Sequence, residues 1–406
     1  MKYKIGIRIN VYKILLFFLA LYFLLIPFDN YRIPVIYISY SNLVICISFF
    51  FTAICLMIKK NVPSSLFIRY PFPFFIGCFV ICMVTIINIV FRKTPATGLK
   101  DIFFILSIWM YFISSSFVLI KYPNALIFIL KCLFISVFIS ALGGYYEIFY
   151  YMIHHEYWQE PALMSIGGVQ FIRMTGTYFD PNYCSVMPLM GMVLAVVLDF
   201  SRKWKLLFFL FFGIAVISTF SRMAFIAVSV FIFVYHIINS NNKQVKYLTI
   251  LIIFIIGIFT IPYLLQKLFL LNPDSTSQRL DLLKNSITEW LHRPIFGYGF
   301  GKQIYIDFEG TQKLYESHNT YLQLLLYGGC VSFISIFFPI LFYLKKVYRN
   351  NCHDKINVSV RNFIIYFMPP FFVNLFFLNY FNMKYFWIFI FLILQYFYIQ
   401  THNKYE

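Results

Sequence analysis

Charged residues are scarce in this sequence, and acidic residues are the scarcest of them. Only 12% of the 406 residues are charged, with 15 Asp and Glu against 33 Lys and Arg. Soluble globular chains carry about 25% charged residues, so this composition excludes an ordinary soluble domain. In their place, 61% of the residues are hydrophobic and 22% are aromatic. The sequence therefore predicts an integral membrane protein.

Cysteine pairs with the spacing of a disulfide framework or a zinc site are missing as well. Six of the eight cysteines lie inside apolar runs, Cys184 borders one, and Cys352 lies in a basic loop. Neither a CxxC motif nor a Cys/His ligand spacing is present. We therefore expect no metal site, no disulfides and no cofactor.

Long apolar runs recur along the whole chain, each long enough to cross a hydrocarbon core of about 30 Å. The first run follows several basic residues, as in a signal peptide, but no small-residue cleavage site follows it, so we expect it to be retained. Twelve runs can be counted: 11–28, 34–58, 72–90, 102–120, 124–150, 183–199, 204–220, 222–238, 247–266, 319–344, 362–380 and 384–400.

The distribution of charge orients these runs. With twelve crossings and the N-terminus inside, the formal net charge is +16 on the inner side and +2 on the outer side. This asymmetry follows the positive-inside rule. We therefore expect a multi-pass protein of the cytoplasmic (inner) membrane with both termini cytoplasmic. Membrane lipid is then the expected partner, and the excess of basic residues does not require a nucleic acid.

The predicted fold is all-α: one integral membrane domain over residues 1–406, with about twelve transmembrane helices and one long external (periplasmic) loop, 267–317. Within the loop, residues 278–291 have helical periodicity, and Pro294 ends the pattern. This predicts a helix on the membrane surface or on the bundle. Arg279 lies at the edge of its apolar stripe, either turned inward or reaching the lipid headgroups. The stripe consists of Leu280, Leu283, Ile287, Trp290 and Leu291.

Ser218–Arg222 interrupts an apolar stretch that is too long for one crossing, so we expect a tight hairpin with Arg222 at its tip. No acidic residue lies within ten positions of this arginine. Such a cation inside a membrane region needs an external anion or a distant partner. Arg222 is therefore either an ordinary loop cation or a phosphate ligand, since a guanidinium can contact phosphate through two bonds.

Three other polar segments lie on the same predicted face. Asp180, Pro181 and Asn182 are typical of a helix start, and Arg173 shortly before them adds another external cation. The glycines of residues 297–301 lack the Lys-Ser/Thr ending of a phosphate-binding loop, so we interpret them as a flexible turn. His154-His155-Glu156 is interpreted as interfacial rather than metal-binding.

His318 lies where the long polar loop returns to an apolar run, within Ser317-His318-Asn319. A single histidine at a helix start is more often structural. Here, however, it shares its predicted membrane face with three arginines. A neutral imidazole can accept a proton at neutral pH, and arginines can hold a pyrophosphate leaving group. The outer face contains no DxD-like cluster, which disfavours a metal-dependent transferase.

These residues resemble the motifs of the bacterial O-antigen polymerase and O-antigen ligase superfamily. No single motif is specific to this superfamily. The order of the motifs, together with a long loop between the ninth and tenth runs, is specific to it. The resemblance is densest between residues 173 and 329. The matching segments are RMTGTYFDPN (173–182), STFSR (218–222), SQRLDLLKNSITEW (277–290), RPIFGYGFG (293–301) and SHNTYLQLLLYGG (317–329).

The resemblance implies a metal-independent glycosyltransferase that uses an undecaprenyl-pyrophosphate-linked oligosaccharide on the external face. By this likeness His318 is the catalytic base, and Arg222 and Arg279 bind the pyrophosphate. A chain-length regulator and a flippase are candidate partners. Further candidate substrate-binding residues are Arg173, Asp180, Asn182 and Asn319.

The finer activity remains open at this point. By the same resemblance, the FDPN turn and the 53 Phe and 32 Tyr favour a polymerase that joins lipid-linked repeat units of O-antigen, capsule or exopolysaccharide. The alternative is an O-antigen ligase that transfers the glycan to lipid A-core. Two alternatives belong to other functional classes: a flippase or other transporter, and a lipid-linked scaffold. A transporter would be expected to show repeats and several ionisable residues within spans, whereas only Lys131 and Glu147 lie well inside a run, about 24 Å apart on one helix.

Overall fold

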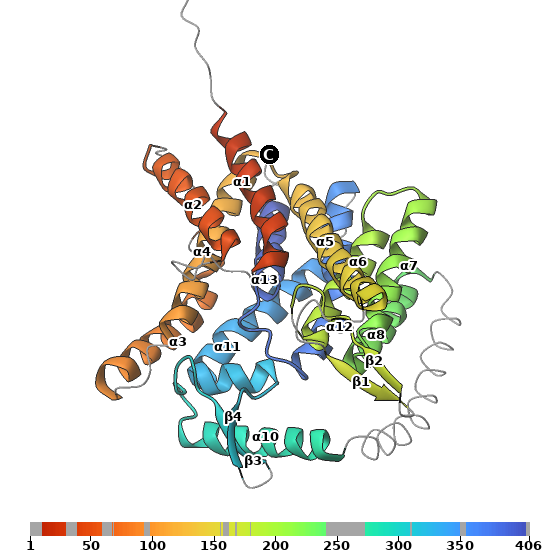
Figure 1. Cartoon of the computed structure of the whole chain (residues 1–406). Helices are drawn as coiled ribbons and strands as arrows, with labels where there is room; N and C mark the ends of the chain where they lie inside the picture. Colours follow the sequence, from red (N-terminus) through yellow and green to blue (C-terminus); the bar gives the residue numbers. More distant parts are fainter. Residues whose placement is uncertain are drawn as a thin grey trace, which may run out of the picture.

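The computed structural model describes residues 10–29, 39–58, 67, 69–92, 98–154, 156, 162–166, 169–178, 180–240, 273–308, 311–349 and 355–402. In these ranges the chain forms twelve α-helices, one short 3-10 helix and two β-hairpins (Figure 1). The prediction of an all-α, polytopic membrane protein is confirmed. The two hairpins are small additions that the sequence did not predict.

Eleven of the twelve predicted runs coincide with helices, and the run 247–266 lies outside the described residues. Eight described helices are long and apolar enough to cross a membrane: α1 with η1, α2, α3, α4, α5, α8, α11 and α12. Helix α6 is apolar but shorter. The helices are α1 (Val11–Leu25), η1 (Ile26–Phe28), α2 (Tyr40–Ile58), α3 (Phe72–Arg92), α4 (Gly98–Lys121), α5 (Ala125–His154), α6 (Pro181–Val197), α7 (Arg202–Ser218), α8 (Arg222–Asn239), α10 (Pro273–His292), α11 (Thr320–Arg349), α12 (Lys355–Leu375) and α13 (Lys384–His402).

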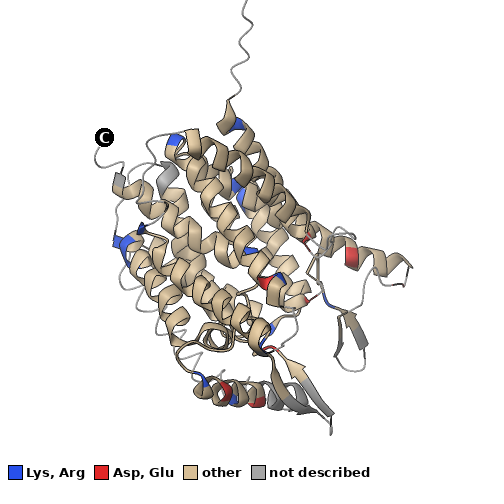
Figure 2. Ribbon diagram, turned by 90° about the vertical axis from the view of Figure 1, so that its left-hand side faces the viewer, with Lys and Arg blue, Asp and Glu red and all other residues tan. Residues whose placement is uncertain are grey.

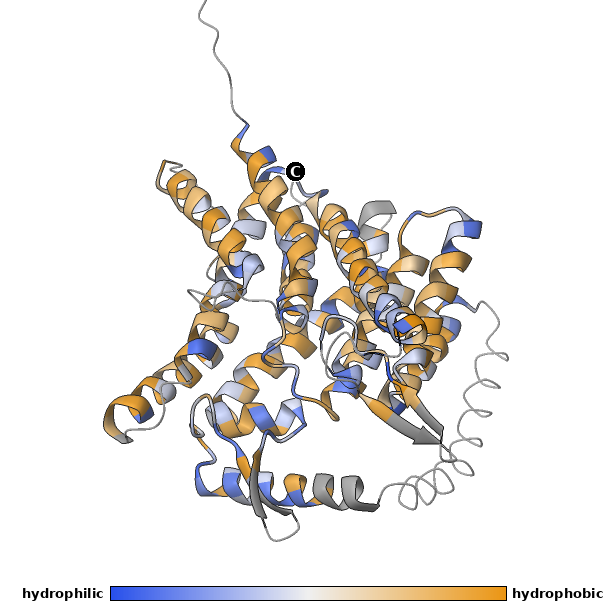
Figure 3. Ribbon diagram, in the orientation of Figure 1, coloured by the Kyte–Doolittle hydropathy of each residue, from blue (hydrophilic) through white to orange (hydrophobic). Residues whose placement is uncertain are grey.

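Helix α13 lies in the middle of the bundle, where nearly every side chain from Tyr385 to Tyr398 is buried. The start of α1 and the end of α13 lie at the same end of the molecule, as an even number of crossings requires (Figure 1). Most acidic residues that are drawn lie toward the opposite end, which carries α10 and the hairpins (Figure 2). Apolar residues dominate the helices between the two ends (Figure 3).

Helix α10 lies across the end of the bundle (Figure 1). It is joined to α11 by a glycine-rich turn and by the hairpin of β3 (Ile304–Phe308) and β4 (Thr311–Tyr315). Leu282 on α10 is buried against Ile304 and Leu326, and Ser286 one turn later is fully buried. A helix is thus confirmed in the loop.

The face of α10 that contacts the bundle differs from the predicted stripe. Leu280, Leu283 and Leu291 are 55%, 43% and 61% exposed, because β3 and α11 cover the neighbouring face through Leu282. Only Trp290 of the predicted stripe packs against this cluster. The expectation that the stripe could face the bundle is therefore wrong for the exposed leucines.

The glycine-rich turn is closely packed, which corrects the expectation of a flexible turn. Gly329 has a φ of 62° and breaks α11, leaving carbonyl groups without helical partners. The N–H groups of Tyr298 and Gly299 donate to Leu326 and Tyr327 at 2.7 and 2.8 Å. Phe300 N–H donates to Thr85 Oγ1 at 2.7 Å. These three N–H groups are occupied and do not form an anion site.

Candidate functional site

The predicted hairpin between α7 and α8 is confirmed. Thr219 and Phe220 close the turn by donating their N–H groups to carbonyls of the last turn of α7. Phe220 has a φ of 47°, a left-handed conformation that is strained for a side chain of this size. Arg222 follows as the first residue of α8, and its side chain is exposed.

Arg173 holds this turn from the side. Its Nε donates to the Thr219 carbonyl at 3.0 Å, and its Nη2 donates to Asn182 Oδ1 at 3.3 Å. The hydroxyl of Ser221 donates to the same Asn182 oxygen at 3.0 Å. Two of the motifs that the sequence singled out, residues 173–182 and 218–222, therefore meet in one network next to Arg222.

The first turns of α6 and α8 are capped differently. Asp180 caps α6, since its Oδ1 accepts the N–H of Asn182 at 2.7 Å, as the sequence predicted. Ser221 occupies the same position before α8, but its hydroxyl is bonded to Asn182 and forms no cap. The partial positive charge of the α8 N-terminus is thus not satisfied by Ser221 and lies beside Arg222.

The His318 turn lies before α11 and is also strained, with a φ of 47° at His318. Among the described residues, Phe220 and His318 are the two non-glycine residues with positive φ. Asn319 caps α11 by accepting the N–H of Leu322 at 3.0 Å, and its side-chain amide donates to the Phe376 carbonyl at 3.0 Å. Ser317 N–H donates to Gln323 Oε1 at 2.8 Å.

The connection between α12 and α13 anchors this turn. Thr320 Oγ1 donates to the Leu378 carbonyl at 2.6 Å and accepts the N–H of Tyr380 at 2.9 Å. Asn379 donates to Glu316 Oε2 at 2.7 Å, while its carbonyl accepts the hydroxyl of Tyr183 at 3.2 Å. Tyr183 directly follows Asn182, so this path joins the His318 turn to the Arg173 network.

Three residues in these networks were missed by the sequence reasoning. Asn379 and Tyr183 belong to no sequence motif that would have marked them. Their role comes from hydrogen bonds between segments that are far apart in the chain. Glu147 was visible as a charged residue within a span, but its partner was not. It is buried in α5, where it accepts hydrogen bonds from Thr175 and Gly176, whereas Lys131 on the same helix is exposed.

Arg279 lies in the first half of α10, and its side chain is outside the described residues. It precedes the buried Leu282 by three positions and the buried Ser286 by seven. Residues at these spacings share one face of a helix. The role of Arg279 therefore stays a prediction from the sequence.

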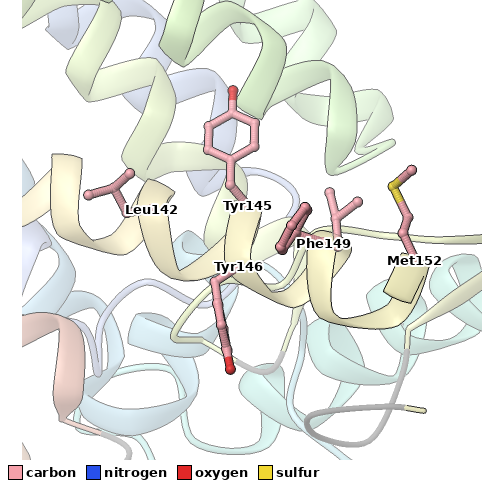
Figure 4. A pocket seen from close by; sticks show the side chains of 6 residues that line it. Leu142, Tyr145, Tyr146, Phe149 and Met152 are labelled. Carbon is pink, nitrogen blue, oxygen red and sulfur yellow. The ribbon is translucent and has the colours of Figure 1, made fainter. Parts of the chain in front are cut away.

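An apolar groove of about 490 Å³ lies along the second half of α5 (Figure 4). Tyr145 at its edge donates to the Phe211 carbonyl of α7 at 2.6 Å. The opposite face of the same stretch carries Glu147 and Gly144, against which Met174 packs. The groove is lined by Leu142, Tyr145, Tyr146, Ile148, Phe149 and Met152.

Within the described residues, no three His, Cys, Asp or Glu side chains are grouped closely enough to hold a metal ion. His154 is exposed and its ring lies 4.5 Å from that of Tyr150. His155 lies outside the described residues.

Comparison with known families is consistent with these motifs. Residues 206–337 match the family model described as O-antigen ligase, a range that contains Arg222, Arg279 and His318. No curated protein matches the chain. Members of the matched family are glycosyltransferase-like enzymes that act on lipid-linked glycans. The domain over residues 206–337 therefore supports a likeness of this membrane protein to the O-antigen ligase and polymerase-like superfamily.

Proposed function

We propose that this protein is a polysaccharide polymerase at the outer face of the cytoplasmic membrane. It joins repeat units carried on undecaprenyl pyrophosphate, without a metal ion. The observation that carries the proposal is the exposed Arg222 at the uncapped N-terminus of α8, beside a turn fixed by Arg173 and Asn182. Arginine and a helix N-terminus both favour a bound pyrophosphate.

The proposed reaction is a direct displacement at the anomeric carbon of the donor. His318 accepts the proton of the acceptor hydroxyl while the hydroxyl oxygen forms the new glycosidic bond. The bond between the anomeric carbon and the phosphate oxygen breaks, and the electron pair leaves with undecaprenyl pyrophosphate. Arg222 and Arg279 stabilise the negative charge on that leaving group. His318 then releases its proton to water.

The other candidate residues support this arrangement in different ways. The guanidinium of Arg173 donates hydrogen bonds to the Thr219 carbonyl and to Asn182. We therefore assign Arg173 to stabilising the Arg222 turn and not to binding phosphate by itself. Asp180 and Asn319 cap α6 and α11. The apolar groove on α5 has the chemistry to receive part of the polyprenyl chain.

A ligase is the second candidate, because the matched family model carries that description. The two activities are separated by the surface glycans of a strain that lacks the gene. Loss of long chains, with single repeat units remaining, supports a polymerase. Long chains that accumulate without attachment to lipid A-core support a ligase. An unchanged glycan pattern would overturn both.

A further inference from the structure

Glu147 is a carboxylate inside a candidate membrane span, 3% exposed. An ionisable group at such a position is costly unless hydrogen bonds compensate for the lost water. Its Oε2 accepts the N–H groups of Thr175 and Gly176 at 2.9 and 3.1 Å, and its Oε1 accepts the Thr175 hydroxyl at 2.8 Å. Both carboxylate oxygens are therefore turned toward one short segment, residues 173–177.

The segment fits closely against α5. Gly176 has a φ of 57°, and a Cβ there would lie 3.1 Å from the Ser140 carbonyl oxygen. Gly144 faces Met174 so closely that a Cβ would meet its methyl group at 2.1 Å. Glycines at these positions let the segment approach the helix, and Glu147 then supplies acceptors for its N–H groups.

From this segment the contacts continue to the Arg222 turn. Arg173, two residues before Thr175, binds the Thr219 carbonyl and Asn182. The N–H of Met174 donates to the Ser218 carbonyl at 2.9 Å. An unbroken series of hydrogen bonds and covalent neighbours thus leads from Glu147 to the residue before Arg222.

We propose that Glu147 is a positioning residue for the pyrophosphate site. It holds residues 173–177 against α5, so that Arg173 fixes the Ser218–Ser221 turn and thereby the direction of Arg222. This rests on the proposed function, since it assumes that Arg222 binds the donor pyrophosphate.

The test compares the wild-type protein with Glu147→Gln, both purified in lipid nanodiscs. Gln keeps the size of the side chain but presents an NH₂ group where two oxygens accept three donors. We expect the variant to bind farnesyl pyrophosphate about tenfold more weakly, which corresponds to about 1.4 kcal/mol. Farnesol, which lacks the pyrophosphate, serves as the control ligand. With lipid-linked repeat units, kcat/KM for the donor should fall about tenfold while the acceptor KM changes little.

Two outcomes separate this inference from the proposed function. If the wild-type protein neither binds farnesyl pyrophosphate nor transfers glycan, the proposed function fails. If the wild-type protein does both and Glu147→Gln has the same affinity and the same kcat/KM for the donor, the positioning role is wrong. A fall in the transfer rate with unchanged affinity for farnesyl pyrophosphate would equally overturn it.

Matched variants keep the test decisive. Lys131→Gln changes an exposed charge on the same helix and should leave farnesyl pyrophosphate binding unchanged. If Glu147→Gln does not accumulate in the membrane, Thr175→Val removes only the hydroxyl bond and should weaken binding about threefold. Combining Thr175→Val with Arg173→Lys should cost less than the sum of the two, because both act through one series of contacts. Additive effects would contradict the proposal.

Discussion

The two strained turns of the candidate site, Ser218–Arg222 and Ser317–Thr320, are built on opposite plans. In the first, the strained residue is Phe220, and the candidate ligand Arg222 lies two positions later, exposed. In the second, His318 is itself the strained residue. A left-handed non-glycine residue costs about 1–3 kcal/mol, so each turn needs outside contacts to persist.

Those contacts come from different parts of the molecule. Arg173 and Asn182 hold the Arg222 turn from the α5–α6 side. The His318 turn is held by Asn319 and Thr320 against the α12–α13 connection. In both turns the residues that hold the geometry differ from the residue proposed to react. The residue proposed to react and the residues that stabilise its turn can therefore be substituted separately, which makes the comparison testable.

The largest effect is expected at His318. Asparagine adopts a left-handed backbone more readily than most residues but cannot serve as a base, so His318→Asn should keep the turn. Glycosyl transfer should fall by about 100-fold or more, as is usual when a general base is lost. The measurement is the transfer rate in nanodiscs together with the surface glycan ladder. The exposed His154 offers a control, and His154→Asn should behave as wild type. A ladder of normal length from the His318 variant would rule out the catalytic role.

A smaller loss is expected for Arg222→Lys. Lysine keeps the charge but cannot form two parallel bonds to a phosphate, so kcat/KM for the donor should fall at least about tenfold and approach that of Arg222→Ala. The measurement is donor kinetics at constant acceptor. Arg202, exposed at the start of α7, provides the matched control, since Arg202→Lys should have no effect. Wild-type kinetics in Arg222→Lys would argue against a bidentate grip.

Thr320→Val addresses the support of the His318 turn. The buried carbonyl of Leu378 and the N–H of Tyr380 would both lose their partner, which should lower stability by about 1–3 kcal/mol. The unfolding temperature in nanodiscs measures this. Thr401→Val is the control, because Thr401 bonds only to carbonyls of its own helix. Equal unfolding temperatures for the two variants would show that the α12–α13 connection does not hold the turn.

The smallest effect is expected for the pH dependence of stability at the ion pair of Lys302 with Glu289. Lys302, whose carbonyl accepts from Gln323 at 3.2 Å, pairs with Glu289 at 2.8 Å. The hydrogen bond from Lys302 lowers the pKa of Glu289 below its ordinary value. A lowered pKa in the folded state gives stability that is present above the unfolded pKa and is lost as pH falls through the folded pKa.

Hydrogen exchange of α10 can detect this pair. Lys302→Gln should speed exchange slightly at pH 7, and the difference from wild type should vanish in acid, once Glu289 is protonated. The effect is small because Glu289 is partly exposed. Lys284→Gln, an exposed change on the same helix, should exchange as wild type at both pH values. A difference for Lys302→Gln that persists unchanged in strong acid would mean that the ion pair is not its cause.

Much of the fold could be predicted because spans are defined by local composition. Eleven of the twelve runs coincide with helices, and the hairpin at Arg222 and the cap at Asp180 follow from neighbouring residues. The prediction of which face of α10 contacts the bundle was wrong, because periodicity locates an apolar stripe but not the element that covers it. The glycine-rich turn was misjudged for a related reason: its N–H groups find partners in Leu326 and Tyr327, beyond the reach of local patterns.

The sequence by itself determined the membrane-spanning character and the two motifs that contain Arg222 and His318, since apolar length and motif order are properties of the linear chain. Only the tertiary structure decided what holds those residues. The partner of Glu147 lies 28 positions away, and Asn379 reaches Glu316 across 63. Such contacts depend on how helices pack together, and a buried polar group finds its partner wherever that packing brings one.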